Sequence, residues 1–147
     1  MTKKILIVED EKNLIKVIED TLIGESFITY KALDGESALD IFYEYNPDLI
    51  LLDINLPKMD GWEVCQNIRK ESNIPIIMMT ARDSEIDELK GLSIGADDYI
   101  TKPFSLKVLN IKVKKMLKID ENSYYKFNNL SFDFRSGELI VNNEGIE

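Results

Sequence analysis

Residues 49–53 have the sequence LILLD, in which four consecutive apolar residues end at a carboxylate. An apolar run of this length is typical of a strand that is covered on both faces, as the strands of a parallel sheet are. We expect strands in four further short segments, some of which are also continuously apolar: residues 5–8, 27–32, 76–80 and 99–101. The sequence therefore predicts five strands.

Between these segments the apolar residues recur at helical spacing. The first such stretch carries Leu14, Val17, Ile18 and Leu22. We expect further helices around residues 38–42, 64–68, 86–89 and 108–117. A regular alternation of strand and helix predicts a parallel sheet with right-handed crossovers and helices on both faces, which is an open, doubly wound α/β domain. Ligands of such domains bind at the carboxyl ends of the strands.

The composition is that of a folded protein. The chain has 147 residues, of which 44% are hydrophobic and 31% are charged, and this excludes disorder throughout the chain. No apolar run approaches the roughly 20 residues that cross a bilayer. Only four consecutive apolar residues precede Glu9 near the amino terminus, too few for a secretion signal. We therefore expect a cytoplasmic protein without a membrane span.

Residue usage excludes several kinds of chemistry. The chain contains no histidine, which removes histidine-based catalytic triads and histidine-ligated metal sites. Its single cysteine, Cys65, lies in an apolar periodic stretch where a packed thiol is expected. The net charge of −9 is unfavourable for holding a phosphate backbone, so this chain by itself is not expected to bind DNA.

The pattern changes after residue 119. Residues 1–119 carry the strand and helix alternation, residues 120–125 are polar and read as a linker, and residues 126–147 resemble two strands joined by a turn. We expect these last residues to begin a second domain. Residues 120–147 together hold two basic and six acidic residues, a balance that again opposes DNA binding.

Five polar residues end or follow the predicted strands: Glu9, Asp10, Asp53, Thr80 and Lys102. The carboxyl ends of parallel strands share one edge of the sheet, so these side chains should converge. Three neighbouring carboxylates repel one another and need shared protons or a cation. Mg²⁺ prefers oxygen ligands of this kind, and a lysine ammonium can bind a phosphoryl group. We therefore expect a magnesium site.

Each of these residues also has a simpler interpretation. A carboxylate at a helix start often only caps the helix, and Lys102 alone would be read as a surface lysine. Thr80 alone reflects strand propensity, and Tyr99 near an edge strand is explained by packing. For one carboxylate we would favour the cap, but not for three together.

Four segments resemble the receiver domain of two-component response regulators. They are ILIVEDE at residues 5–11, DINLPKMDG at 53–61, MTAR at 79–82 and GADDYITKPF at 95–104. They occur together, in order and at matching spacing, over residues 1 to about 119. The resemblance implies a flavodoxin-like fold with strand order 2-1-3-4-5 and five helices.

The resemblance also implies the chemistry of the site. Asp53 would be the phosphoacceptor and would take its phosphoryl group from the phosphohistidine of a sensor histidine kinase. Mg²⁺ would be held by Glu9, Asp10, Asp53 and the backbone carbonyl of Asn55. The phosphoryl oxygens would be bound by Thr80, Ala81 and Lys102, with a cis bond between Lys102 and Pro103. Such a protein is a signalling switch rather than a turnover enzyme.

In the family, a switch connects the site to a distant surface. Thr80 would move toward the phosphoryl group while Tyr99 turns inward, which biases the surface of the fourth helix, fifth strand and fifth helix. Asn55 and Arg82 flank the site and would tune the lifetime of the phosphoryl group.

The same surface would form a homodimer upon activation. By resemblance, Asp97 or Asp98 with Lys112 would supply a charge pair between subunits. Val108 stands where this class usually has glutamate, and Glu88 where a basic residue is common. These two departures affect the strength of any dimer.

The last residues are similar to the opening strands of the winged-helix domain in the OmpR/PhoB class, so the sequence looks like a truncated transcription factor whose missing part would bind promoter DNA. Three other functions compete with this interpretation. An aspartyl-phosphate phosphatase would carry its nucleophile after the first strand, and a flavodoxin-like cofactor binder would need a phosphate loop where Glu9, Asp10 and Glu11 stand. A phosphorylation-independent interaction module is the alternative that the sequence opposes least.

Overall fold

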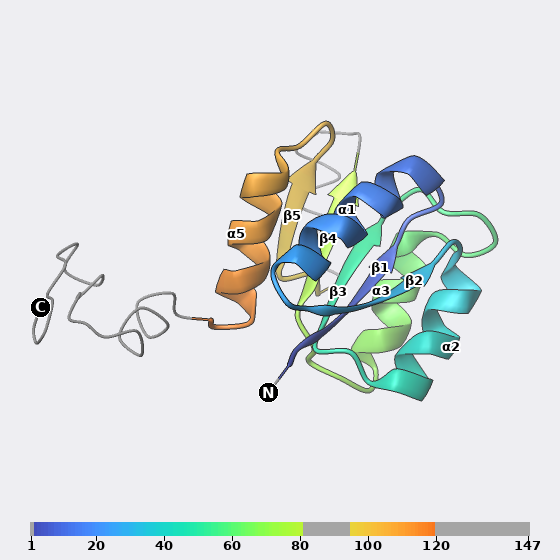
Figure 1. The fold of residues 1–147 in the computed structure, drawn as a ribbon. Coiled ribbons are helices and arrows are strands. Elements are labelled where there is room, and N and C mark those ends of the chain that lie inside the picture. Colours follow the sequence, from blue (N-terminus) through green and yellow to red (C-terminus); the bar gives the residue numbers. More distant parts are fainter. Residues whose placement is uncertain (1, 81–94, 120–147) are drawn as a thin grey trace, which may run out of the picture. The chain divides into compact units, whose positions relative to one another are not determined.

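The computed structural model describes residues 2–80 and 95–119 (Figure 1). The strands are β1 (Lys4–Val8), β2 (Ile28–Ala32), β3 (Leu49–Asp53), β4 (Ile76–Thr80) and β5 (Asp98–Thr101). The helices of the described residues are α1 (Lys12–Gly24), α2 (Gly35–Tyr45), α3 (Gly61–Arg69) and α5 (Leu106–Met116). The helix expected around residues 86–89 lies outside the described residues, as do the linker and strands expected in 120–147.

The five strands form one parallel sheet in the order β2-β1-β3-β4-β5. This confirms the predicted fold class and strand order. In register, Val8 of β1 is paired with Leu52 of β3, so the residues that follow β1 lie beside the end of β3. Every residue of β3 and of β4 is buried, as expected for inner strands that are covered on both faces.

Helices cover both faces of the sheet (Figure 1). Alternate residues of β1 and β3, such as Leu6, Val8, Ile50 and Leu52, pack in one apolar cluster with side chains of α2 and α3. Because neighbouring strand residues point to opposite faces, Ile5 and its counterparts face the other layer, where α1 and α5 lie. The sheet is therefore the middle of three layers.

Three described helices begin at residues that cap them. The Asp34 carboxylate accepts a hydrogen bond from the Ser37 amide at α2, and Asp60 accepts one from the Glu63 amide at α3. At α5 the Ser105 hydroxyl accepts a hydrogen bond from the Lys107 amide.

The apolar residues of α5 do not all face the sheet. Leu109 and Val113 are fully buried, but Val108 is 42% exposed and Ile111 is 59% exposed. Residues 109 and 113 lie one turn apart on the side that faces the sheet, whereas residues 108 and 111 are rotated away from it. The helix therefore buries a narrower arc than its apolar residues occupy.

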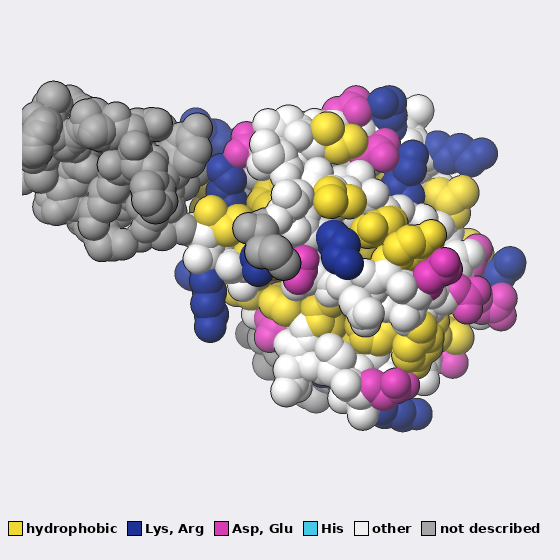
Figure 2. All heavy atoms as spheres, turned by 60° about the horizontal axis from the view of Figure 1, so that its bottom comes forward, with side chains coloured by type: hydrophobic (Ala, Val, Ile, Leu, Met, Phe, Trp, Pro, Cys, Tyr) yellow, Lys and Arg dark blue, Asp and Glu magenta, His cyan; other side chains and the backbone are white. Residues whose placement is uncertain are grey.

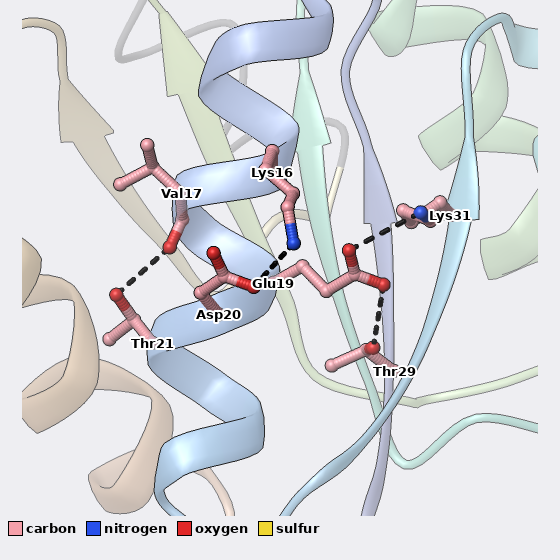
Figure 3. A network of polar contacts seen from close by, with 7 residues as sticks. All are labelled: Lys16, Val17, Glu19, Asp20, Thr21, Thr29 and Lys31. Carbon is pink, nitrogen blue, oxygen red and sulfur yellow. Dashed lines mark hydrogen bonds and ion pairs between the residues drawn. The ribbon is translucent and has the colours of Figure 1, made fainter.

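A small polar network joins α1 to the edge strand β2 (Figure 3). The Glu19 carboxylate lies 3.3 Å from the Lys31 ammonium and accepts a hydrogen bond from the Thr29 hydroxyl. Lys16 and Asp20 form a second ion pair one helical turn apart at 2.9 Å. Such exposed pairs contribute little stability, so the apolar layers carry most of it.

Figure 2 brings forward the side of the domain where the strands begin. Acidic and basic side chains are interspersed there with apolar ones, and this view shows no large area of one sign among the described residues. None of the helices in residues 2–80 and 95–119 is long and apolar enough to cross a membrane.

Mutations can distinguish the buried face of α5 from its exposed face. We expect Leu109→Ala to lower the free energy of unfolding by about 2–5 kcal/mol, because it leaves a cavity in the packed layer. Ile111→Ala, a truncation of a similar side chain on the exposed face, should change it by less than about 0.5 kcal/mol. Urea unfolding followed by circular dichroism measures both, and equal losses would contradict the orientation of α5.

Candidate functional site

The site lies at the carboxyl edge of the sheet, where the strand order brings together residues distant in sequence. Glu9 directly follows β1, Asp53 is the last residue of the neighbouring β3, and Thr80 is the last residue of β4. Lys102 follows β5, and its amide donates a hydrogen bond of 2.6 Å to the Thr80 carbonyl. The register thus places the ends of four strands at one point, as the sequence pattern predicted.

Three carboxylates cluster there. Single carboxylate oxygens of Glu9, Asp10 and Asp53 all lie within 4.8 Å of one another. Glu9 is 1% exposed and Asp53 is 3% exposed, whereas Asp10 lies on the surface. Two buried acids and one exposed acid therefore form an anionic recess that opens to solvent on one side.

One cation lies between the two buried acids. The Lys102 ammonium is 2.6 Å from Glu9 Oε1 and 3.2 Å from Asp53 Oδ2. The bond from Lys102 to Pro103 is cis, as expected. Because unpaired charges are costly to bury, this lysine offsets the repulsion between two carboxylates that the sheet brings close together.

The environment shifts the pKa values of this pair. Burial raises the pKa of the Glu9 carboxyl above its ordinary value, although hydrogen bonds from Lys102 and from the Glu11 amide act in the opposite direction. Burial lowers the pKa of Lys102, but the hydrogen bond to Glu9 and the charges of Asp53 and Glu9 outweigh it. The pKa of Lys102 is therefore raised, and the ammonium stays protonated at neutral pH.

Backbone groups fix the orientation of the buried acids. The Asn55 amide donates a hydrogen bond of 3.2 Å to Asp53 Oδ1, and the Glu11 amide donates one of 3.0 Å to Glu9 Oε2. Gly61 begins α3 directly against the Asp53 backbone, where any β-carbon would overlap the Asp53 carbonyl oxygen. The chain around the site is thus packed backbone against backbone.

Two of the other predicted residues lie in β4 and β5, and three lie outside the described residues. Tyr99 lies in β5, half-buried, against the apolar cluster of α2 and α3. Thr80 is fully buried at the end of β4. Ala81, Arg82 and Glu88 lie outside the described residues.

The residues expected at a dimer surface form ion pairs within the chain. The Asp97 carboxylate lies 2.6 Å from the Arg69 guanidinium at the end of α3, and it also accepts a hydrogen bond from the Ile76 amide. The Asp98 carboxylate lies 3.0 Å from the Lys112 ammonium of α5. Arg69 was not singled out from the sequence, because its partner is 28 residues away and no local spacing indicates the contact.

A groove lies beside the acidic recess, and no pattern in the sequence indicated it. The groove has a volume of about 440 Å³ and lies between the start of α1 and the segment that joins β5 to α5. Its lining is mostly apolar and consists of Glu11, Leu14, Val17, Lys102, Pro103, Phe104 and Leu106. Phe104 and Leu106 lie in a loop and a first helical turn, where apolar periodicity is too short to be recognised.

The comparisons with known proteins agree with this geometry. Residues 5–114 match the family described as the response regulator receiver domain. The chain is 35% identical to the receiver domain of the Francisella response regulator 1452, with a TM-score of 0.77, over 80% of this chain and 98% of that chain. It is 33% identical to a two-component response regulator from Clostridium difficile, with a TM-score of 0.78 and the same two coverages.

A third similar structure belongs to a longer protein. DrrB from Thermotoga maritima, described as an OmpR/PhoB homolog, is 34% identical to this chain, with a TM-score of 0.75. The match covers 80% of this chain and 54% of DrrB. The similarity therefore extends over about half of the length of DrrB.

The Lys102 ion pairs predict a pH-dependent stability. With a chelator present to remove metal ions, Lys102→Met should lower the free energy of unfolding by about 2–4 kcal/mol near pH 7, because the substitution leaves two buried carboxylates without a cation. Because the pKa of Glu9 is raised, the folded state binds this proton more tightly than the unfolded state does. Protonation of Glu9 therefore contributes to stability at low pH, and this contribution declines as the pH rises through the folded-state pKa. Without Lys102 that pKa should rise further, so the loss should be smaller near pH 5 than near pH 7.

Urea unfolding at both pH values measures this effect. The control is Lys112→Met, which breaks the more exposed pair with Asp98 and should cost less than about 1 kcal/mol. The same loss at both pH values for Lys102→Met would contradict the assigned role of the ion pairs.

Proposed function

Since the chain belongs to the response regulator receiver domain family, we propose that it is a phosphorylation switch whose phosphoacceptor is Asp53. The observation that carries the proposal is the arrangement of charges at the carboxyl edge of the sheet. A buried carboxylate that ends the central strand lies 3.2 Å from a lysine ammonium and beside two further acids. Such a recess can receive a dianionic phosphoryl group only with the help of cations, and it holds one of them.

The donor would be a phosphohistidine of a sensor histidine kinase. An Asp53 carboxylate oxygen attacks phosphorus, the new P–O bond forms an acyl phosphate, and the P–N bond breaks with its electron pair returning to the imidazole. The hydrogen bond from the Asn55 amide to Oδ1 fixes the orientation of the Asp53 carboxylate.

The acidic recess fits Mg²⁺ in its donor chemistry. Its oxygens come from Glu9, Asp10 and Asp53, and the backbone carbonyl of Asn55 would complete the protein ligands, with water filling the remaining positions. When bound, the ion neutralises charge on the transferring phosphoryl group. The exposure of Asp10 leaves one side of the recess open for the donor to approach.

The remaining residues would bind the phosphoryl oxygens and transmit the switch. Lys102, Thr80 and the Ala81 amide would each bind one oxygen, and Thr80 would move toward the group while Tyr99 turns inward. Lys102 already faces Asp53, so it needs only to exchange part of its contact with Glu9. Asn55 and Arg82 would tune the lifetime of the acyl phosphate.

The output would be that of a cytoplasmic transcription regulator of the OmpR/PhoB class. The likeness to DrrB supports this class. Residues 126–147 would form the first strands of a winged-helix domain, and promoter DNA would contact that domain rather than the acidic receiver. Residues 1–119 would form the receiver and 120–125 the linker.

Activation would pair two receivers through the fourth helix, β5 and α5. The exposed Val108 and Ile111 give α5 an apolar surface that could pack against a second copy. Asp97, Asp98 and Lys112 lie near it, and their ion pairs within the chain would be exchanged for pairs between subunits.

The phosphoacceptor can be tested by intact mass. After incubation with Mg²⁺ and a small-molecule acyl phosphate, we expect a single phosphoryl adduct that Asp53→Asn and a chelator both abolish. Asp40→Asn, which changes an exposed acid of α2, should leave the adduct unchanged. Labelling of Asp53→Asn at the same stoichiometry would contradict the assignment, and no adduct in any sample would favour a phosphorylation-independent interaction module.

The dimer surface can be tested by sedimentation. We expect Mg²⁺ and the acyl phosphate to shift the protein toward a dimer, and Ile111→Asp to weaken this dimer at least about tenfold, because it places a charge in an apolar contact. Ile23→Asp changes an equally exposed isoleucine on α1 and should leave the dimer intact. An equal effect of the two substitutions would exclude α5 as the contact surface.

A further inference from the structure

The start of α2 contacts the segment that follows Asp53. Gly35 is the first residue of α2, and a β-carbon at this position would overlap the Met59 carbonyl oxygen. The same β-carbon would lie 2.7 Å from Met59 Cβ and 2.9 Å from Val64 Cγ2. The nearest of these atoms belongs to the backbone, so a rotamer change cannot relieve the overlap. Only glycine lets the two backbones approach this closely.

The contacted segment is the one that leads away from the phosphoacceptor. Residues 54–60 join β3 to α3, and a hydrogen bond of 2.8 Å from the Gly61 amide to the Ile54 carbonyl closes them into a loop. Within it the Asn55 amide is bonded to Asp53 Oδ1. A displacement of Met59 in so short a closed loop has to be taken up by the residues on either side of it.

A second link connects the same two elements. The Lys58 ammonium lies 3.8 Å from the Asp34 carboxylate, which also caps α2 through the Ser37 amide. Lys58 is more than half exposed, so this link is weak and mainly indicates how close the loop and the helix start are. The close contact at Gly35 is therefore the main constraint that α2 places on the loop.

We propose that Gly35 is a positioning residue for the metal site: by allowing α2 to support the loop at Met59, it holds Asn55 in place beside Asp53. This inference rests on the proposed function, in which the Asn55 carbonyl is a Mg²⁺ ligand. Residues that orient ligands without touching the metal commonly change its affinity by about 10–100-fold when they are altered.

The test is a titration of the Gly35→Ala variant with Mg²⁺, monitored through backbone amide shifts in ¹H–¹⁵N NMR spectra. The same spectra report whether the variant is folded. We expect Gly35→Ala to raise the Mg²⁺ dissociation constant about tenfold. Two controls should change it by less than about twofold, because they lie at the far end of α1. Gly24→Ala changes a glycine with no atom within 4 Å of the added β-carbon, and Leu22→Ala destabilises the core through a buried side chain.

The outcomes separate the two proposals. If the unchanged protein binds Mg²⁺ and Gly35→Ala binds it equally well, Gly35 only packs, and the positioning role is overturned while the proposed function stands. If the unchanged protein shows no Mg²⁺-dependent shifts around Asp53, the proposed metal site is wrong and the inference falls with it. An equal loss of affinity in Leu22→Ala would assign the effect to stability and would also overturn the positioning role.

Hydrogen exchange of the unchanged protein decides the case in which Gly35→Ala does not fold. If α2 supports the loop, Mg²⁺ should slow amide exchange at residues 36–38 more than at residues 20–24 of α1. Equal protection of the two segments would overturn the proposal.

Discussion

The Lys102 ammonium lies between two carboxylates that the sheet buries side by side, and the rest of the site depends on this contact. Parallel pairing of β1 with β3 puts Glu9 beside Asp53, and neither acid has more than 3% of its surface exposed. Burial raises the pKa of the Glu9 carboxyl, and the negative charge of Asp53 adds to this effect. The hydrogen bond from Lys102 acts in the opposite direction but does not outweigh burial, so the pKa of Glu9 remains raised. Three carboxylates share this recess with one lysine, so its oxygen donors suit a further cation.

The layers around the sheet serve the same recess. α3 begins against the Asp53 backbone at Gly61, and α2 begins against the following loop at Gly35. Both helices have aspartate caps, so their starts are fixed at the edge of the sheet where the acids lie. Backbone contacts of this kind leave little freedom for the loop that carries Asn55, which suits a site that must hold oxygen ligands at short, defined distances.

Much of the fold could be predicted from local patterns. Continuous apolar runs gave the strands, helical spacing gave the helices, and the alternation of the two gave the parallel sheet. The convergence of Glu9, Asp53 and Lys102 also followed, because strand ends of a parallel sheet share an edge. The buried face of α5 could not be predicted in this way: Val108 and Ile111 are apolar, and local spacing does not reveal that the helix buries the side of Leu109 and Val113 instead.

The sequence by itself thus determined the type of fold, the edge that carries the site and the chemistry of its residues. Only the tertiary structure decided which atoms meet: that Lys102 contacts both Glu9 and Asp53, that Asp97 pairs with Arg69, and that Gly35 touches Met59. The physical reason is the range of the forces involved. Periodicity reflects burial, which is averaged over a whole face, whereas ion pairs and close contacts depend on a few tenths of an ångström between segments that are distant in the chain.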